Sequence, residues 1–233
     1  MLPGEESMLG AGDIHLWQVD LADERWDSGQ VVLHPQERHG MDIERRRART
    51  ALRLILGHYL EYAPQHLMLI RDELGKPHLA DKPLHFSLAH SNSCALIGLS
   101  RVSLGVDLER EDESLNCSRL FDWVCHARER FSLEALPLAL HRAFYYRLWV
   151  AKEAYCKAIG LGLRKPMTSF WVRHFGRGRY DIVDPGEQGG YRLRYLPSLP
   201  GWTAACCSRL VAPRLNCYWA TPSAQNNVLK LSA

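Results

Sequence analysis

One stretch constrains the fold more than any other. Residues His141 to Ile159 contain neither Gly nor Pro, and Gly160 follows them directly. This pattern predicts a long helix that ends at a glycine. Trp149, Glu153 and Lys157 are spaced four apart, so they share one face of that helix, and Lys152 points off it. The simplest interpretation is a solvated Glu153–Lys157 pair, which would stabilise the helix by only a few tenths of a kcal/mol.

A second stretch makes that simple interpretation insufficient. The segment 104–110, L-G-V-D-L-E-R, predicts a strand on which Asp107 and Glu109 leave the same face. Two carboxylates side by side repel each other unless a cation lies between them, and a hard divalent ion such as Mg²⁺ suits oxygen ligands. The alternative is a pair of exposed acids on an edge strand.

Taken together, the two stretches resemble a known family. G-V-D-L-E at 105–109, followed by W-V-A-K-E-A-Y-C-K at 149–157, is similar to the paired signature of the 4′-phosphopantetheinyl transferases. The chain length fits their long, single-chain Sfp-type form, and the resemblance extends from about residue 36 to about residue 210. It implies an α+β fold of two similar lobes, each a long helix packed on a small antiparallel sheet, with the ligand site at the lobe interface. The expected lobes are 1–111 and 112–233, with a loose tail after about 221.

Composition narrows the remaining classes. The 233 residues are 46% hydrophobic and 24% charged, which argues against disorder. A net charge of +3 is too small to indicate a nucleic-acid binder. No apolar run is long enough to span a membrane, and the N-terminal residues lack the pattern of a signal peptide. The seven cysteines contain no C-x-x-C pair, so we expect reduced thiols in a cytoplasmic protein, which the family suggests is a monomer.

Hydrophobic periodicity and turn residues predict the other elements. A long helix is expected over 36–60, a turn over 73–77, and one or two helices over 115–140. Strands are expected over 13–21, 67–71, 84–90, 94–100, 169–174, 179–183, 191–196, 202–210 and 216–220.

The resemblance also implies three residues that meet the phosphates of coenzyme A. Arg49 lies in an arginine-rich helix, which could otherwise be a solvated or RNA-binding surface. Lys76 lies in the turn Gly75-Lys76-Pro77, which could equally be a plain surface loop. His90 matches the histidine of a family Ser-His pair, whereas the preceding serine is Ala89 here.

The remaining site residues follow from the same resemblance. Glu129 aligns with a third acidic ligand, so Mg²⁺ would be held by Asp107, Glu109 and Glu129. Lys157 would neutralise phosphate oxygens. Glu153 is the candidate general base, acting directly or through a metal-bound water. The expected catalytic residues are therefore Glu153, Lys157 and Asp107.

The implied reaction transfers the 4′-phosphopantetheine arm of coenzyme A to a serine of an apo acyl or peptidyl carrier protein. An exposed basic and apolar rim within 115–147, including Arg128 and Arg130, is expected to receive the carrier. Alternatives are a Mg²⁺-dependent hydrolase of nucleotides or coenzyme A, and a degenerate coenzyme A binder in which Ala89 weakens the site. An RNA-binding module is disfavoured because the segment 38–53 has no aromatic residue for base stacking.

Overall fold

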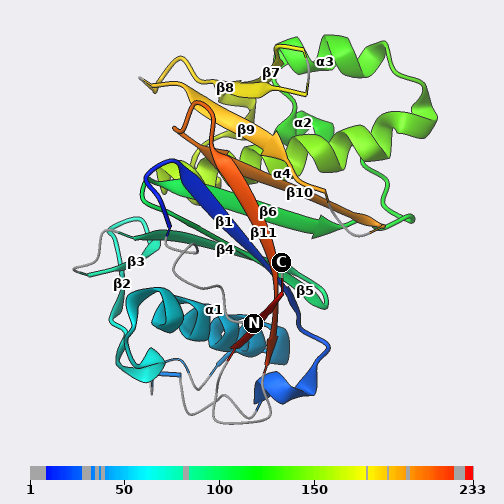
Figure 1. Cartoon of the computed structure of the whole chain (residues 1–233). Coiled ribbons are helices and arrows are strands. Elements are labelled where there is room, and N and C mark those ends of the chain that lie inside the picture. Colours follow the sequence, from blue (N-terminus) through cyan, green and yellow to red (C-terminus); the bar gives the residue numbers. More distant parts are fainter. Residues whose placement is uncertain are drawn as a thin grey trace. The chain divides into compact units, whose positions relative to one another are not determined.

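The computed structural model describes residues 9–27, 33–34, 37, 40–80, 84–176, 178–187, 189–197, 200–222 and 229–232. They form two compact units (Figure 1). Unit 1 contains the chain up to Arg71 together with 77–101 and the segment from Pro213 onward. Unit 2 contains 72–76 and 102–212. The division therefore differs from the expected boundary at 111, because the chain enters unit 2 after Arg101 and its last strands return to unit 1.

Unit 1 is a mixed sheet covered by one long helix. The strand order is β12-β11-β1-β5-β4, in which β1 pairs in parallel with β11 and antiparallel with β5. Helix α1 lies along one face of this sheet, and its Leu52 and Ile55 share a buried core with Trp17 of β1 (Figure 1). The elements are β1 (Asp13–Asp20), α1 (Ile43–Leu60), η4 (Pro64–His66), β2 (Leu69–Arg71), β3 (Pro77–Leu79), β4 (His85–Ser91), β5 (Cys94–Ser100), β11 (Arg214–Pro222) and β12 (Leu229–Ser232).

Helix α1 begins later than predicted. Its first residue is Ile43, and the side chain of Asp42 accepts a hydrogen bond from the backbone N–H of Arg45 at 2.8 Å. Gly40 has a φ of 78°, a left-handed conformation that does not continue a helix. The N-cap and the glycine therefore set the start, whereas the periodic pattern had suggested residue 36. Residues 36, 38 and 39 lie outside the described residues.

The prediction of a loose tail after 221 is wrong for the described part of that segment. Strand β11 continues to Pro222, and β12 pairs antiparallel with it. On its other edge, β11 runs parallel to β1 from Asp13↔Arg214 to Val19↔Ala220, so β11 lies between β1 and β12 in the sheet. The guanidinium of Arg214 also donates to the Asp13 carboxylate at 2.7 Å. Residues 223–228 lie outside the described residues.

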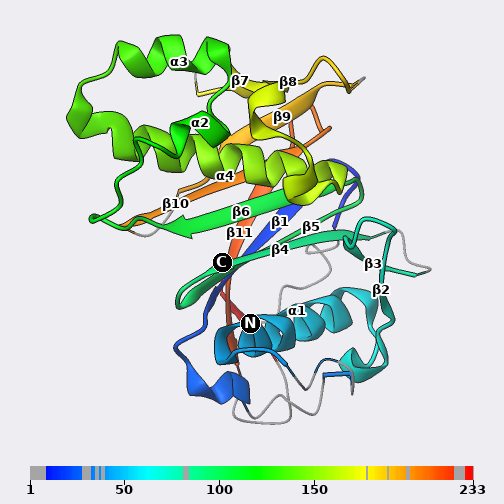
Figure 2. The ribbon, with the colours of Figure 1, turned by 180° about the vertical axis from the view of Figure 1, so that it is seen from behind.

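Unit 2 is an antiparallel sheet with the second long helix on one face. The strand order is β6-β10-β9-β8-β7, and α4 packs on it through a core that includes Ala151, Tyr155 and Leu193 (Figure 2). Helices α2 and α3 add a second apolar cluster against α4. The elements are β6 (Leu104–Arg110), α2 (Phe121–Val124), α3 (Ala127–Glu134), η5 (Leu138–Leu140), α4 (His141–Ile159), η6 (Gly162–Arg164), η7 (Met167–Ser169), β7 (Trp171–His174), β8 (Tyr180–Val183), β9 (Tyr191–Tyr195) and β10 (Trp202–Ser208).

The predicted α+β class is confirmed, and so is the helix that ends at a glycine, since Gly160 has a φ of 82°. All seven cysteines are free thiols, and all but Cys217 are buried. Among the described helices, none combines the length and apolar character that crossing a bilayer requires.

Candidate active site

The site in unit 2 begins with the close approach of α4 to β6. A Cβ placed on Gly105 would lie 1.9 Å from the carbonyl oxygen of Ala154 and 2.5 Å from the backbone nitrogen of Ala158. The strand can therefore touch the helix backbone only where it has no side chain. Because residues two apart share a strand face, Asp107 and Glu109 leave β6 on the same face as Gly105, which is the face toward α4.

Helix α4 meets both carboxylates with residues of its predicted stripe. The ammonium of Lys157 donates to Oδ1 of Asp107 at 2.6 Å, and the indole N–H of Trp149 donates to Oε1 of Glu109 at 3.2 Å. Glu153 lies between these two residues on the same face of the helix. From the sequence, Trp149 was assigned no role at the site, although its place in the stripe was a signal that it would also meet the strand.

The electrostatics of the site show carboxylates crowded together in a poorly solvated place. Burial raises the pKa of Glu153 to about 7, with Lys157 opposing the rise and Asp107 and Glu109 adding to it. Burial also raises the pKa of Asp107, although Lys157 partly offsets this. Burial lowers the pKa of Lys157, but Asp107 more than compensates, so the net shift is upward.

Two buried oxygen atoms of this site have no hydrogen-bond partner, namely Oδ2 of Asp107 and Oε1 of Glu153. Buried polar atoms are nearly always satisfied, so each of these oxygens is a place where a water or an ion would bind. A hard divalent cation is a ligand that would satisfy carboxylate oxygens. Within the described ranges, no three His, Cys, Asp or Glu side chains are already arranged as a metal site. The two unpartnered oxygens are therefore the feature that fits Mg²⁺.

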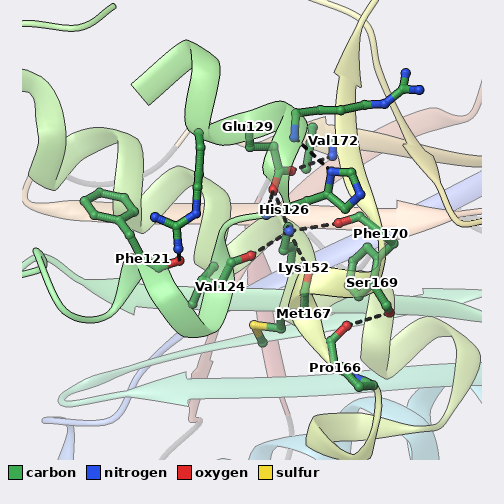
Figure 3. Close-up of polar contacts among 12 residues, drawn as sticks. Phe121, Val124, His126, Glu129, Lys152, Pro166, Met167, Ser169, Phe170 and Val172 are labelled. Atoms are coloured by element: carbon green, nitrogen blue, oxygen red, sulfur yellow. Dashed lines mark hydrogen bonds and ion pairs between the residues drawn. The ribbon is translucent and has the colours of Figure 1, made fainter. Parts of the chain in front are cut away.

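Glu129, the expected third metal ligand, is engaged elsewhere (Figure 3). Its Oε2 accepts from the ammonium of Lys152 at 2.6 Å and from the backbone N–H of His126 at 2.8 Å. Its Oε1 accepts from the backbone N–H of Val172 at 2.7 Å. Both oxygens thus have partners, and the structure does not gather Glu129 into a metal site with Asp107 and Glu109.

Lys152 is the centre of this second cluster (Figure 3). The side chain is fully buried, and its ammonium donates to the carbonyl oxygens of Val124 and Met167, each at 2.7 Å, and of Phe170 at 3.0 Å. With Glu129 these acceptors surround the ammonium completely. The cluster ties α2, α3, α4 and the segment before β7 together, and Lys152 precedes Glu153 directly in the chain.

Unit 1 contains the expected phosphate-binding arginine. Arg49 lines a pocket of about 600 Å³ together with Arg53 and Arg71. The guanidinium of Arg49 lies 3.5 Å from Glu37, which also accepts from Arg53 at 2.5 Å. Arg53 lies four residues after Arg49 on the same helical face, and neither Arg53 nor Arg71 was assigned a role from the sequence.

The other two expected phosphate ligands are placed as follows. The ammonium of Lys76 donates to the carbonyl oxygen of Ala158 at 3.0 Å and to the hydroxyl of Ser103 at 3.2 Å, at the end of α4. Burial lowers the pKa of Lys76. His90 lies half-buried on β4, where it pairs with Ala95 of β5. Ala89, which replaces the family serine, is buried.

Comparison with known proteins identifies the family. Residues 103–207 match the 4′-phosphopantetheinyl transferase superfamily, described as ACPS. A putative 4′-phosphopantetheinyl transferase of Synechocystis sp. is 30% identical, over 85% of this chain and 82% of its own length. The 4′-phosphopantetheinyl transferase Sfp of Bacillus subtilis is 29% identical, over 58% of this chain and 60% of its own length. A holo-(acyl-carrier-protein) synthase of Bacillus anthracis has 21% identity and a TM-score of 0.40, over 46% of this chain and 93% of its own.

The acids of β6 and the lysine and glutamate of α4 all lie within the segment that matches the transferase superfamily. The chain belongs to the 4′-phosphopantetheinyl transferase family. The predicted resemblance, including the Sfp-type form, is confirmed.

Proposed function

We propose that this enzyme transfers the 4′-phosphopantetheine group of coenzyme A to a serine hydroxyl of an apo acyl or peptidyl carrier protein, with Mg²⁺. The observation that carries the proposal is the meeting of Asp107, Glu153 and Lys157, with two buried carboxylate oxygens left unpartnered. Family membership supplies the reaction class.

In the transfer, the serine oxygen forms a bond to the β-phosphorus of coenzyme A and the P–O bond of the pyrophosphate breaks. Adenosine 3′,5′-bisphosphate leaves with the bridging oxygen. The serine proton passes to Glu153, whose carboxylate lies beside Lys157 and Asp107 and can accept it. Lys157 stabilises the charge that develops on the phosphate oxygens.

Asp107 and Glu109 would hold Mg²⁺ with the unpartnered oxygen of Glu153 beside them, and we do not assign Glu129 to the ligand set. Bound Mg²⁺ would supply charge neutralisation to the pyrophosphate. Trp149 orients Glu109 through its indole N–H. In unit 1, Arg49 and Arg71 line a pocket and carry guanidinium groups of the kind that bind phosphate.

For the carrier, the expected rim on α2 and α3 has a suitable surface. Trp123 and Phe131 are 79% and 80% exposed. Arg128 stacks over Trp171 at 4.5 Å from the ring centroid, and Arg130 pairs with Asp122 at 2.6 Å. Reversing the charge of Arg128 and Arg130 should raise KM for the carrier and leave coenzyme A affinity unchanged. Unaltered carrier kinetics would remove this rim from the proposal.

The decisive experiment is intact-mass analysis of an apo carrier incubated with the enzyme, coenzyme A and Mg²⁺, beside an EDTA control. We expect the carrier to gain one phosphopantetheine only when the metal is present. Asp107→Asn should slow the gain at least about a hundredfold, because the isosteric amide cannot hold a cation as the carboxylate does. The matched control is Asp20→Asn, an exposed aspartate of unit 1 whose contact with the backbone N–H of Ala22 an asparagine can retain, so the rate should be unchanged. No mass gain with several different carriers would overturn the proposal.

A further inference from the structure

Unit 2 contains a second charged pocket, on the sheet face opposite to α4. Ile182 and Leu193 pack into the core shared with α4, so their strand neighbours Asp181, Arg192 and Arg194 point to the other face. A cavity of about 460 Å³ opens there, and it is lined by Arg173, Phe175, Arg179, Asp181, Arg192, Arg194 and Val211. We call it the arginine pocket. None of its residues belongs to the carboxylate site described above.

One row of this pocket is internally paired. The sheet register places Arg173 of β7 opposite Asp181 of β8, and Asp181 opposite Arg192 of β9. Arg192 forms an ion pair with Asp181, and the guanidinium of Arg173 lies 3.7 Å from the same carboxylate. Asp181 is 5% exposed. A single buried carboxylate therefore serves two arginines.

The next row has no such counter-charge. Tyr180 pairs with Leu193, so extending the register by one residue places Arg179 opposite Arg194. On the other side of Arg179 lies Phe175, the residue that follows β7, and its N–H donates to the carbonyl oxygen of Arg179 at 2.9 Å. In the part of the chain that the structure describes, neither Arg179 nor Arg194 takes part in an ion pair. Like charges directly opposite each other on a sheet destabilise it.

We propose that the arginine pocket binds a small anion bearing at least two phosphoryl groups. Four guanidinium groups face one carboxylate, so the pocket has a surplus of positive charge spread over two neighbouring rows. A single phosphate could accept hydrogen bonds from Arg179 and Arg194, whereas a diphosphate can also reach Arg173 and Arg192 in the neighbouring row. Guanidinium presents the planar pair of donors that phosphate oxygens accept, and the volume is that of a small-molecule site. The like-charge row is tolerated because the bound anion stabilises it.

The test is titration of the full chain with inorganic pyrophosphate, in EDTA, by calorimetry and by thermal unfolding. Arg179→Gln and Arg194→Gln should each weaken pyrophosphate binding about tenfold or more, as expected for loss of a charge-assisted hydrogen bond. Without any anion, both variants should unfold at the same or a higher temperature than the wild type, because the like-charge contact is gone. Arg209→Gln is the matched control, since Arg209 is an arginine of unit 2 that pairs with Glu187 at 2.6 Å and does not line the pocket.

Further arms identify where an anion binds and which source it comes from. Inorganic phosphate should bind more weakly than pyrophosphate, and equal affinity would overturn the requirement for two phosphoryl groups. Adenosine 3′,5′-bisphosphate tests a nucleotide source, and a tighter fit than pyrophosphate would support one. If Arg49→Gln abolishes pyrophosphate binding while the two pocket variants leave it intact, the anion belongs to unit 1 and the arginine pocket is not a site.

Discussion

Gly105 shows how one absent side chain can set the geometry of a whole site. A methyl group there would overlap the backbone of α4, which cannot move away as a flexible side chain could. We therefore expect Gly105→Ala to lower the free energy of unfolding by about 3 kcal/mol or more, the upper range for overpacked contacts. Transfer activity should fall with it, because Lys157 and Glu153 would move away from Asp107. Denaturant titration and the carrier assay measure the two effects.

Gly12 provides the control for this substitution. A Cβ at Gly12 would have no atom within 4 Å, and its backbone is not left-handed. Gly12→Ala should therefore change the free energy of unfolding by less than about 1 kcal/mol. Equal losses for the two alanine variants would show that close contact with α4 is not what Gly105 provides.

Glu153 makes stability depend on pH. Its pKa is raised from an ordinary value of 4.5 to about 7, so the folded state holds the proton more tightly than the unfolded state. The stabilisation is therefore complete below pH 4.5 and is lost as the pH rises through about 7. Because Glu153 is only half-buried, we expect the loss to be about 1–2 kcal/mol.

The comparison that isolates this effect is with Glu153→Gln, in EDTA, between pH 5 and pH 8. The variant should gain stability relative to the wild type as the pH rises. Mg²⁺ should raise the unfolding temperature of the wild type more at pH 8 than at pH 5, because it neutralises the ionised carboxylates. A stability difference that stays constant with pH would contradict the crowded-carboxylate account of this site.

At the scale of elements, the Lys152 cluster fixes α4 against its neighbours. Four acceptors from three other segments surround one ammonium in a place without solvent. Lys152→Met retains the length of the side chain but leaves Glu129 buried without its cation. We expect a loss of about 3–5 kcal/mol in the free energy of unfolding, as for other broken buried ion pairs.

The exposed pair Arg130–Asp122 has the same 2.6 Å separation and provides the contrast. Its side chains are 41% and 70% exposed, so Arg130→Met should cost no more than about 1 kcal/mol. The double variant Lys152→Met with Glu129→Gln should lose less stability than the sum of the single changes, because the unpaired charge is removed. Additive losses would show that the two side chains do not stabilise each other.

Several of these elements could be predicted from sequence, and the failures have physical reasons. Helix α4 and strand β6 follow from local periodicity, and so does the face that each presents. The role of Glu129 as a metal ligand stays a prediction, and its contact with Lys152 could not be read from the sequence, because Lys152 lies on a different helix and pairing at that distance leaves no periodic signal. A local signal did exist. The spacing His126-x-x-Glu129 forms a capping box at the start of α3, which occupies the carboxylate with a backbone N–H.

For the whole molecule, the sequence predicted the class and the family but not the path of the chain. The segment after 213 was expected to belong with the preceding strands, yet β11 lies beside β1 in unit 1. Parallel pairing between residues so far apart in the chain depends on tertiary contacts and cannot be read from either strand alone. The polar composition of the tail predicted a loose end, because the strand that pairs with β11 cannot be identified from composition.

This path predicts that truncation after Ala212 destabilises unit 1, although the lost segment is remote in sequence from the rest of that unit. Strand β11 lies between β1 and β12, so its removal leaves the backbone groups of β1 unpaired along one edge and uncovers apolar surface. We expect a lower unfolding temperature and self-association, measured by calorimetry and by analytical ultracentrifugation. Truncation after Pro222 keeps β11 and should be much milder, as should Arg214→Gln, which removes only the ion pair with Asp13. If truncation after Ala212 proves as mild as truncation after Pro222, β11 does not hold unit 1 together, since only the first removes the strand that hydrogen-bonds to β1.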